Sequence, residues 1–434
     1  MAWDFSTDPE FQHKLDWAHT FVTEEVEPLD LVWPAPANYQ PLTPERRKVV
    51  DPLKQAVRDQ RLWACHLGPE LGGEGYGQVK LALLNEILGR SSWAPIIFGT
   101  QAPDTGNAEI LAHYGTQEQK KRYLEPLLSG EIFSCYSMTE PHAGADPAMF
   151  TTRAVRDGDD WVIDGWKFFS SNARWSEFLI VMAYTDPEAG PVKGMSMFLV
   201  PRDTPGVNIV RNTGLIGETE DEGAHALIHY EQVRVPADAL LGEEGGAFAV
   251  AQTRLGGGRV HHAMRTVGLA QRALDMLCER ALSRTTKGTS LSAKQTVQEY
   301  IADSYAQLRQ FRLFVLNVAW QIDRYQDYKK VRKDIAAIKA LTPTVLQDIV
   351  RRSIQVHGAL GVSNELPLGR MWMQAPVMAI VDGPTEVHKI TVARQVLRDY
   401  RPSDSQWPSE HLPPKTAAAR AKVAAALELD VDDL

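Results

Sequence analysis

The chain has 434 residues, of which 44% are hydrophobic and 23% are charged, a composition typical of globular proteins and unlike that of disordered or fibrous chains. At about 100 to 200 residues per domain, this length predicts two to four domains or one three-part fold. The formal net charge of −9 excludes a general electrostatic attraction to nucleic acid or to an anionic membrane. Any anionic ligand must be held by local cations.

Three cysteines, Cys65, Cys135 and Cys278, lie far apart in the sequence and predict neither a disulfide framework nor a zinc site. No apolar run approaches the roughly 18 to 20 residues that span a bilayer, so no transmembrane segment is expected. The N-terminal residues are acidic and lack a basic stretch followed by an apolar one, which argues against a secretory signal. We therefore expect a cytoplasmic protein with no metal site.

Residues 1–130 look helical and predict an N-terminal helical domain. From residue 131 the sequence changes to short β-rich runs separated by Asp, Gly and Pro, which predicts an antiparallel β-domain over residues 131–245. The predicted strands include Trp161 to Ile163, Phe178 to Tyr184, Met195 to Val200, Val207 to Val210 and Ala226 to Tyr230.

Helical periodicity returns after Gly246 and predicts a helical bundle over residues 246–400, which the family resemblance given below implies is a four-helix bundle. Three apolar faces support it: Val260, Met264, Val267, Ala270, Leu274, Leu277 and Ala281; Val297, Ile301, Leu308, Phe311, Val315 and Val318; Ile335, Ile338, Leu341, Val345 and Ile349. Pro343 lies within the third face, where we expect it to kink or end the helix. Residues 401–434 predict a Pro-rich linker and a short helix. The predicted fold class is α+β multidomain, with helical, antiparallel β and helical-bundle parts.

The segment Tyr136 to Asp146 reads YSMTEPHAGAD. Its residue types alone are typical of a Pro/Gly turn with a capping Asp, but the string resembles the flavin-binding segment of acyl-CoA dehydrogenases. That resemblance implies FAD contacts from Tyr136, Met138, Thr139 and Ala145, the last standing where many relatives have Ser.

Further segments resemble the same family in the same order, from about residue 5 to residue 400. The run Asp164 to Asn172 is similar to the strand beside the isoalloxazine ring, which assigns Phe169 and Ser171 to FAD, although Phe169 as a lone aromatic fits a β-domain core as well. The remaining implied FAD residues are Gln355, Gly358 and Ala359 in the glycine-rich pyrophosphate stretch, Pro384 and Glu386 near the base, and Arg284, Thr286 and Gln295 from a neighbouring subunit.

The catalytic base of the family is usually a Glu near the end of the bundle, and Asp382 takes that position, one methylene shorter. We expect the pKa of a carboxylate enclosed by apolar ligand and flavin to be raised. Some relatives place the base on the helix near Arg259 instead, but Gly256, Gly257 and Gly258 precede Arg259 here. The N–H of Gly383 or Asp382 would donate to the thioester carbonyl.

Arg259, His261 and His262 are implied substrate-binding residues. Adjacent histidines are more often structural than functional, and on a helix they point about 100° apart. The His pair and the Asp-Gly-Pro-x-Glu-Val-His string resemble one branch of the family, whose vertebrate members carry a fused phosphotransferase-like domain and act on 4-hydroxyacyl-CoA. We expect no such domain within these 434 residues.

The resemblance implies an FAD-dependent acyl-CoA dehydrogenase of fatty acid β-oxidation, a homodimer or homotetramer reoxidised by electron-transferring flavoprotein. The alternative is a redox-neutral conversion of 4-phosphoacyl-CoA to enoyl-CoA with loss of phosphate. A third interpretation, a flavin-binding scaffold, conflicts with the carboxylate at Asp382.

Overall fold

The computed structural model describes residues 5–69 and 73–433, so small parts of the predicted N-terminal domain and tail lie outside it. The chain divides into two compact units, Met1–Lys389 and Ile390–Leu434. No helix among the described residues is both long and apolar enough to cross a membrane.

The N-terminal part is helical, as predicted, and three of its helices, those that begin at Pro9, Pro44 and Gln117, follow residues whose side chains cap them. The Asp8 side chain accepts from the N–H of Phe11 at the start of the first helix, and Thr116 forms a capping box with Gln119. The helices are α1 (Pro9–Phe21), α2 (Glu27–Val32), α3 (Pro44–Asp59), α4 (Gln78–Leu88), α5 (Ala94–Ile97), α6 (Asp104–Tyr114), α7 (Gln117–Gln119) and α8 (Glu125–Ser129).

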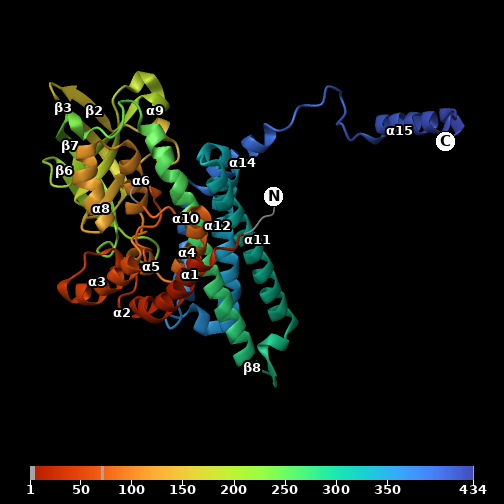
Figure 1. Ribbon diagram of the computed structural model, residues 1–434, viewed down its shortest axis with the longest axis horizontal. Helices are drawn as coiled ribbons and strands as arrows, with labels where there is room; N and C mark the ends of the chain where they lie inside the picture. The colour runs from red at the N-terminus through yellow and green to blue at the C-terminus, as the bar shows by residue number, and fades with distance from the viewer. Residues whose placement is uncertain (1–4, 70–72, 434) are drawn as a thin grey trace. The chain divides into compact units, whose positions relative to one another are not determined.

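A seven-stranded sheet follows, in the order β1-β4-β2-β3-β7-β6 with β5 paired to β4 (Figure 1). The strands are β1 (Ser134–Ser137), β2 (Arg153–Asp157), β3 (Asp160–Ser171), β4 (Phe178–Tyr184), β5 (Met195–Pro201), β6 (Val207–Thr213) and β7 (His225–Pro236), with the short helix α9 (Gly190–Lys193) before β5. All five predicted strands are present. Most pairs are antiparallel, as predicted, but β1 and β2 each pair with β4 in parallel, which the sequence analysis did not predict.

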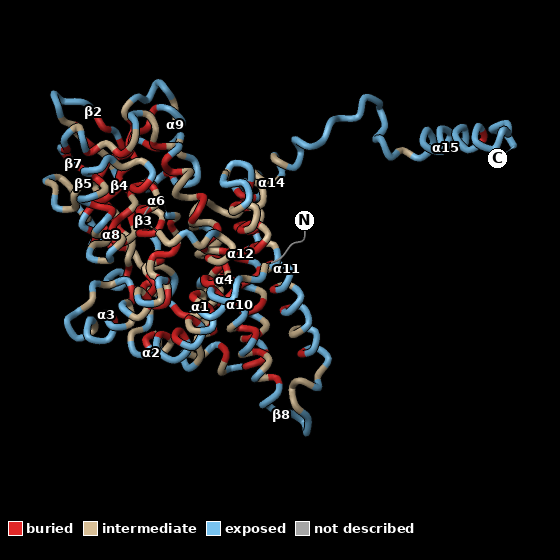
Figure 2. The backbone as a smooth tube through the Cα atoms, in the orientation of Figure 1, coloured by how far each residue is buried: buried red, intermediate tan, exposed pale blue. Residues whose placement is uncertain are grey.

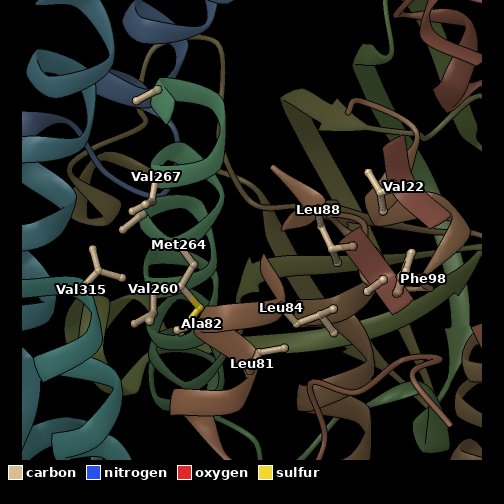
Figure 3. Packing of buried hydrophobic residues seen from close by; sticks show 14 of the residues in the cluster. Val22, Leu81, Ala82, Leu84, Leu88, Phe98, Val260, Met264, Val267 and Val315 are labelled. Atoms are coloured by element: carbon tan, nitrogen blue, oxygen red, sulfur yellow. The ribbon is translucent and has the colours of Figure 1, made fainter. Parts of the chain in front are cut away.

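The C-terminal bundle is built on α10 (Ala247–Ser283), which runs from the β-domain to the β8 (Thr285–Thr286) and β9 (Thr289–Ser290) hairpin (Figure 1). The other bundle helices are α11 (Gln295–Tyr325), α12 (Tyr328–His357), α13 (Leu368–Ile380) and the start of α14 (Thr385–Leu397). Val260, Met264 and Val267 of α10 meet apolar residues of α4 and α11 in one shared core (Figure 3). The N-terminal helices and the bundle are therefore packed as one body, with their buried residues facing inward (Figure 2).

The third apolar face differs from the prediction in two ways. Leu341 is 44% exposed, whereas its neighbours Thr342 and Pro343 are buried. Steps of three residues drift around a helix with 3.6 residues per turn, so Ile338 and Val345 share a buried face that Leu341 leaves. The helix also does not end at Pro343, because packing on neighbouring helices compensates for the missing hydrogen bond.

In the second unit, α15 (Leu412–Leu427) forms the predicted short helix near the C-terminus, and Ala424 is its only buried residue (Figure 2).

Candidate active site

Three consecutive glycines in α10, Gly256, Gly257 and Gly258, lie where side chains of other elements approach this helix. Each glycine costs a helix about 1 kcal/mol relative to alanine, so a run of three needs a compensating reason. A Cβ on Gly258 would lie 2.8 Å from Oδ2 of Asp382, and one on Gly257 would lie 2.9 Å from Oε2 of Glu109. The missing side chains therefore let two carboxylates reach the helix.

Asp382 lies in the connection between α13 and α14, where the backbone is in the left-handed region. Its φ is +55°, and that of Gly383 is +103°, which favours glycine there. The carbonyl of Asp382 accepts from Nε of Arg259 at 3.0 Å and lies 3.2 Å from Nε2 of His388. The N–H groups of Asp382 and Gly383 have no backbone acceptor within the described residues. The connection thus presents a carboxylate and two free N–H donors beside α10.

The carboxylate of Asp382 is paired with one of the two predicted histidines. Nε2 of His262 lies 3.3 Å from Oδ2 of Asp382, with side chains 17% and 13% exposed. Burial raises the pKa of Asp382, but the hydrogen bond and charge of His262, followed by the charges of Arg254 and Arg259, hold it well below its usual range. The raised pKa expected for a carboxylate enclosed by acyl-CoA and flavin stays a prediction, and the sequence did not show how many cations surround this group.

The other histidine, His261, points elsewhere, as expected for adjacent helix residues. It is 8% exposed, its Nε2 has no hydrogen-bond partner, and burial holds its pKa well below the usual range. Of the two adjacent histidines, His262 is therefore the one that contacts the Asp382 carboxylate.

A second carboxylate and an arginine extend the site along α10. Burial raises the pKa of Glu109 to about 8, against an opposing effect of Arg254. The Arg254 guanidinium lies 3.9 Å from the centre of the Tyr136 ring and its Nε donates to Asn107. Neither Glu109 nor Arg254 makes an ion pair within the described part of the chain. The site therefore holds a cation that no protein carboxylate neutralises by contact.

The predicted flavin segment leads from β1 to β2 and is fixed to β3 by a buried ion pair. Nζ of Lys167 donates to the carbonyl of Met138 at 2.8 Å and to Oε1 of Glu140 at 3.0 Å. Glu140 also accepts from the N–H groups of Thr151 and Thr152. These contacts anchor the segment at Met138 and Glu140. Thr139 is partly accessible to solvent, and Ala145 is exposed.

The side chains beside this segment fit a planar aromatic cofactor. Phe169 has φ +52° and is 47% exposed, so the alternative that it packs in the β-domain core is wrong. Oγ of Ser171 lies 2.8 Å from Nδ1 of His225, and the hydroxyl of Tyr136 is buried without a hydrogen-bond partner. An exposed aromatic ring and an unpartnered hydroxyl are what a stacked, hydrogen-bonding ring system would cover. These residues fit FAD.

The other predicted FAD residues lie at the far end of the bundle. Arg284, Thr286, Gln295, Gln355, Gly358 and Ala359 are all exposed. They share that end because Ala281, Val297 and Val356 pack together in one cluster. Gly258 and Ser283 are separated by about 38 Å along α10, at 1.5 Å per residue. Asp382, which lies against Gly258, is therefore separated from Arg284 by the greater part of the length of α10.

Pro384 and Glu386, the two predicted FAD residues that follow Asp382 in the sequence, lie at the start of α14. The carbonyl of Pro384 accepts from the N–H of Val387 and so starts α14, whereas Glu386 is exposed.

Sequence reasoning missed Arg254, Glu109 and the Lys167–Glu140 pair as parts of the site. A signal existed for Arg254, which lies four residues before Gly258 and so shares its helix face. Glu109 carried no signal, because only the tertiary approach of α6 to α10 brings it there.

Sequence profiles of the acyl-CoA dehydrogenase family match almost the whole chain: the N-terminal domain at residues 8–131, the middle domain at 135–232 and the C-terminal domain at 245–397. The chain belongs to the acyl-CoA dehydrogenase family. It is an enzyme of the flavoprotein oxidoreductase class, with FAD as cofactor and acyl-CoA as substrate class.

Individual relatives agree with this assignment. The chain is 44% identical to the probable acyl-CoA dehydrogenase FadE2 of Mycobacterium tuberculosis over 353 residues, which cover 80% of this chain and 86% of that one. It is 42% identical to acyl-CoA dehydrogenase family member 11 of Homo sapiens over 356 residues, covering 81% of this chain but 45% of the relative. The chain thus spans about half the length of that second relative.

Solved structures share the fold of this acyl-CoA dehydrogenase. A putative acyl-CoA dehydrogenase from Mycobacterium abscessus superposes with a TM-score of 0.83 at 38% identity, covering 91% of this chain and 100% of that chain. Butyryl-CoA dehydrogenase from Megasphaera elsdenii gives a TM-score of 0.78 at 25% identity, with coverage of 91% and 100%. The predicted fold class is confirmed.

Proposed function

We propose that this enzyme converts a saturated acyl-CoA to the 2-enoyl-CoA, with Asp382 as the base that removes the α-proton. The observation that carries the proposal is the approach of the Asp382 carboxylate to the Gly258 face of α10. This approach supports Asp382 as the base, because it brings the carboxylate at the family's usual position to the stretch of helix on which some relatives carry theirs. Bound FAD supplies the acceptor for the β-hydride.

The backbone around Asp382 prepares the thioester for this step. The N–H groups of Asp382 and Gly383, which have no backbone acceptor in the described chain, can donate to the thioester carbonyl. Such donors stabilise the negative charge that develops on the oxygen when the α-proton leaves. Arg259 and His388 hold the Asp382 carbonyl and thereby fix the direction of both donors.

Proton removal also needs the carboxylate to become more basic when substrate binds. An acyl chain that covers the site excludes water from Asp382 and strengthens the effect of burial, which raises its pKa. Asp382 therefore gains basicity only in the complex.

The visible flavin spectrum under anaerobic conditions tests the proposal. Adding saturated acyl-CoAs of increasing length to the holoenzyme should bleach the oxidised band for some chain length, and Asp382→Ala should abolish the bleaching. Asp382→Asn, which keeps the shape of the side chain, should do the same. Bleaching that survives in both variants would assign the base to another residue.

A second function is favoured by Arg254. A redox-neutral conversion of a 4-phosphoacyl-CoA to enoyl-CoA with loss of phosphate starts with the same α-proton removal, and it needs a cation for the phosphate. The Arg254 guanidinium, next to Tyr136 and without an ion pair among the described residues, supplies one. Phosphate release without an electron acceptor, lost in Arg254→Leu, would support this function. An absolute requirement for an acceptor would exclude it.

The proposal also includes an FAD site shared between two subunits and a protein that reoxidises the flavin. The distance along α10 between Gly258 and the exposed residues around Arg284 implies that those residues serve the FAD of another subunit, in a homodimer or homotetramer. Electron-transferring flavoprotein would then reoxidise the flavin. A monomer that retains full FAD after dilution would contradict the shared site.

A further inference from the structure

We infer that Asn107 fixes the Arg254 guanidinium as a binding site for an oxyanion, a phosphate or a carboxylate, carried by the acyl part of the substrate. The inference rests on the proposed function, because it concerns the ligand of that same site. Its geometric basis is the 2.8 Å hydrogen bond that Nε of Arg254 donates to Oδ1 of the buried Asn107. Asn107 acts through Arg254 and is therefore a positioning residue.

A buried hydrogen-bond network holds Asn107 in one orientation. Its Nδ2 donates to Oγ of Ser134 at 2.8 Å, and both the N–H and the Oγ of Ser134 donate to Oδ1 of Asp104. Oδ2 of Asp104 in turn accepts from Nε2 of Gln101 at 3.1 Å. Because the amide nitrogen of Asn107 is engaged in this way, its amide oxygen is the atom that faces Arg254.

Two further contacts hold the Arg254 side chain in place. Its guanidinium lies 3.9 Å from the centre of the Tyr136 ring. Gly106 on α6 leaves room for the side chain, because a Cβ there would lie 2.9 Å from Cγ of Arg254. Neither Nη nitrogen of Arg254 donates a hydrogen bond within the residues that the structure describes. The two nitrogens that can bind an oxyanion as a fork are therefore held in place and free to donate.

The carboxyl groups near Arg254 do not replace such an anion. Arg254 opposes the rise in the pKa of Glu109, but the two make no ion pair in the described chain, and burial raises this pKa to about 8, so that Glu109 is protonated at neutral pH. The oxygens of Asp104 accept from Ser134 and Gln101 instead. A partly buried cation without a counter-ion is unfavourable unless a ligand supplies the negative charge.

The position of Arg254 on α10 points to the acyl part of the substrate. Arg254 precedes Gly258 by four residues, so it lies on the same helix face, about 6 Å along the axis from the place where the Asp382 carboxylate approaches. The charge of Arg254 also lowers the pKa of Asp382. The phosphates of CoA are separated from the thioester by the whole pantetheine chain. An anion at Arg254 is therefore a substituent a few bonds from the α-carbon that Asp382 must reach.

The test compares the affinity of the FAD-loaded enzyme for butyryl-CoA, for butyryl-CoA that carries a 4-phosphate, and for glutaryl-CoA. Isothermal titration calorimetry measures binding in an Asp382→Asn background, which prevents turnover of the ligands. We expect at least one of the two anionic ligands to bind about 10-fold more tightly than butyryl-CoA, as a hydrogen-bonded charge pair provides. The phosphate ligand and the carboxylate ligand together show which oxyanion the site takes.

Substitutions in the same background show whether Asn107 and Arg254 produce this preference. Asn107→Leu should reduce the preference about 10-fold and leave the affinity for butyryl-CoA within about 2-fold, because only the orientation of the guanidinium is lost. Asn107→Asp should abolish the preference, because the new carboxylate would pair with Arg254. Arg254→Leu should abolish it too, and Asn107→Leu should then have no further effect on it. Asn85→Leu is the matched control: Asn85 is also buried and accepts from Nε of Arg265 on the same helix at 2.8 Å, and its loss should leave the preference unchanged.

FAD content and the midpoint temperature of thermal unfolding show whether each variant is folded, and Asn107→Ala gives a second substitution if Asn107→Leu is not. The inference is overturned if neither anionic ligand is preferred, or if the preference survives in a folded Asn107→Leu or Asn107→Ala enzyme. Loss of FAD in Asn107→Leu but not in Asn85→Leu would assign Arg254 to the cofactor and would also overturn it. If the preference behaves as expected but no saturated acyl-CoA bleaches the flavin of the enzyme that retains Asp382, only the proposed dehydrogenation fails.

Discussion

Nζ of Lys167 and Oε1 of Glu140 lie 3.0 Å apart, and neither side chain is exposed to solvent. This pair ties the flavin segment to β3, because Lys167 also donates to the carbonyl of Met138. Burial raises the pKa of Glu140, but Lys167 and the hydrogen bonds from Thr151 and Thr152 outweigh it and lower the pKa to about 2.

Lys167→Met should destabilise the enzyme by about 3–5 kcal/mol, because it leaves the Glu140 carboxylate buried without its cation. We also expect weaker FAD retention, since the Met138 carbonyl loses its donor. Thermal denaturation and flavin content measure the two effects. Lys193→Met, on the exposed α9, is the matched control and should change neither. If the Lys167→Met protein unfolds at the same midpoint temperature as the wild type, the Lys167–Glu140 pair does not have this structural role.

Gly258→Ala should lower the rate of flavin reduction about 100-fold, because the added Cβ would lie 2.8 Å from Oδ2 of Asp382 and must displace it. Gly256→Ala is the matched control on the same helix, since its Cβ would meet the Tyr328 ring at an ordinary 3.5 Å. Both substitutions raise helix propensity equally. Equal rates in the two variants would show that the carboxylate is not held against this face.

Glu109→Gln should stabilise the enzyme increasingly as the pH rises. Burial raises the pKa of Glu109 from 4.5 to about 8, so the folded state holds a proton that the unfolded state has already lost. Wild-type stability therefore falls between about pH 4.5 and 8, and the amide removes this loss. The difference between variant and wild type in the midpoint temperature of thermal unfolding should be larger at pH 9 than at pH 5. Glu118→Gln, which changes an exposed carboxylate on α7, is the matched control for the substitution.

The shared FAD site can be tested by complementation. Chains carrying Asp382→Ala and chains carrying Arg284→Ala should each be inactive or bind FAD poorly. If Arg284 serves the partner's site, a mixed dimer regains one complete site, and activity should approach half that of the wild type. If Arg284 served its own chain, no complete site would form and activity would not return. Lys287→Ala, on the same exposed hairpin, controls for local disturbance.

The sequence by itself determined the fold class and the order of its three parts. Runs such as Phe178 to Tyr184 are apolar at every position and became the fully buried β4. The faces through Val260 and Val315 repeat at helical spacing, and those residues are buried. Local periodicity carries this information because each element must bury its own apolar side. Asp382 and its flanking motif were likewise visible, because they are contiguous in sequence.

Only the tertiary structure decided the chemistry around Asp382. The parallel pairing of β1 with β4, the approach of Glu109 to Gly257 and the contact of His262 with Asp382 each join segments distant in the chain. The pKa of Asp382 is lowered for the same reason, because it depends on His262, Arg254 and Arg259, which α10 brings to the carboxylate. Sequence patterns record which side of a helix is buried, but the distance between two charges is set by how the elements pack.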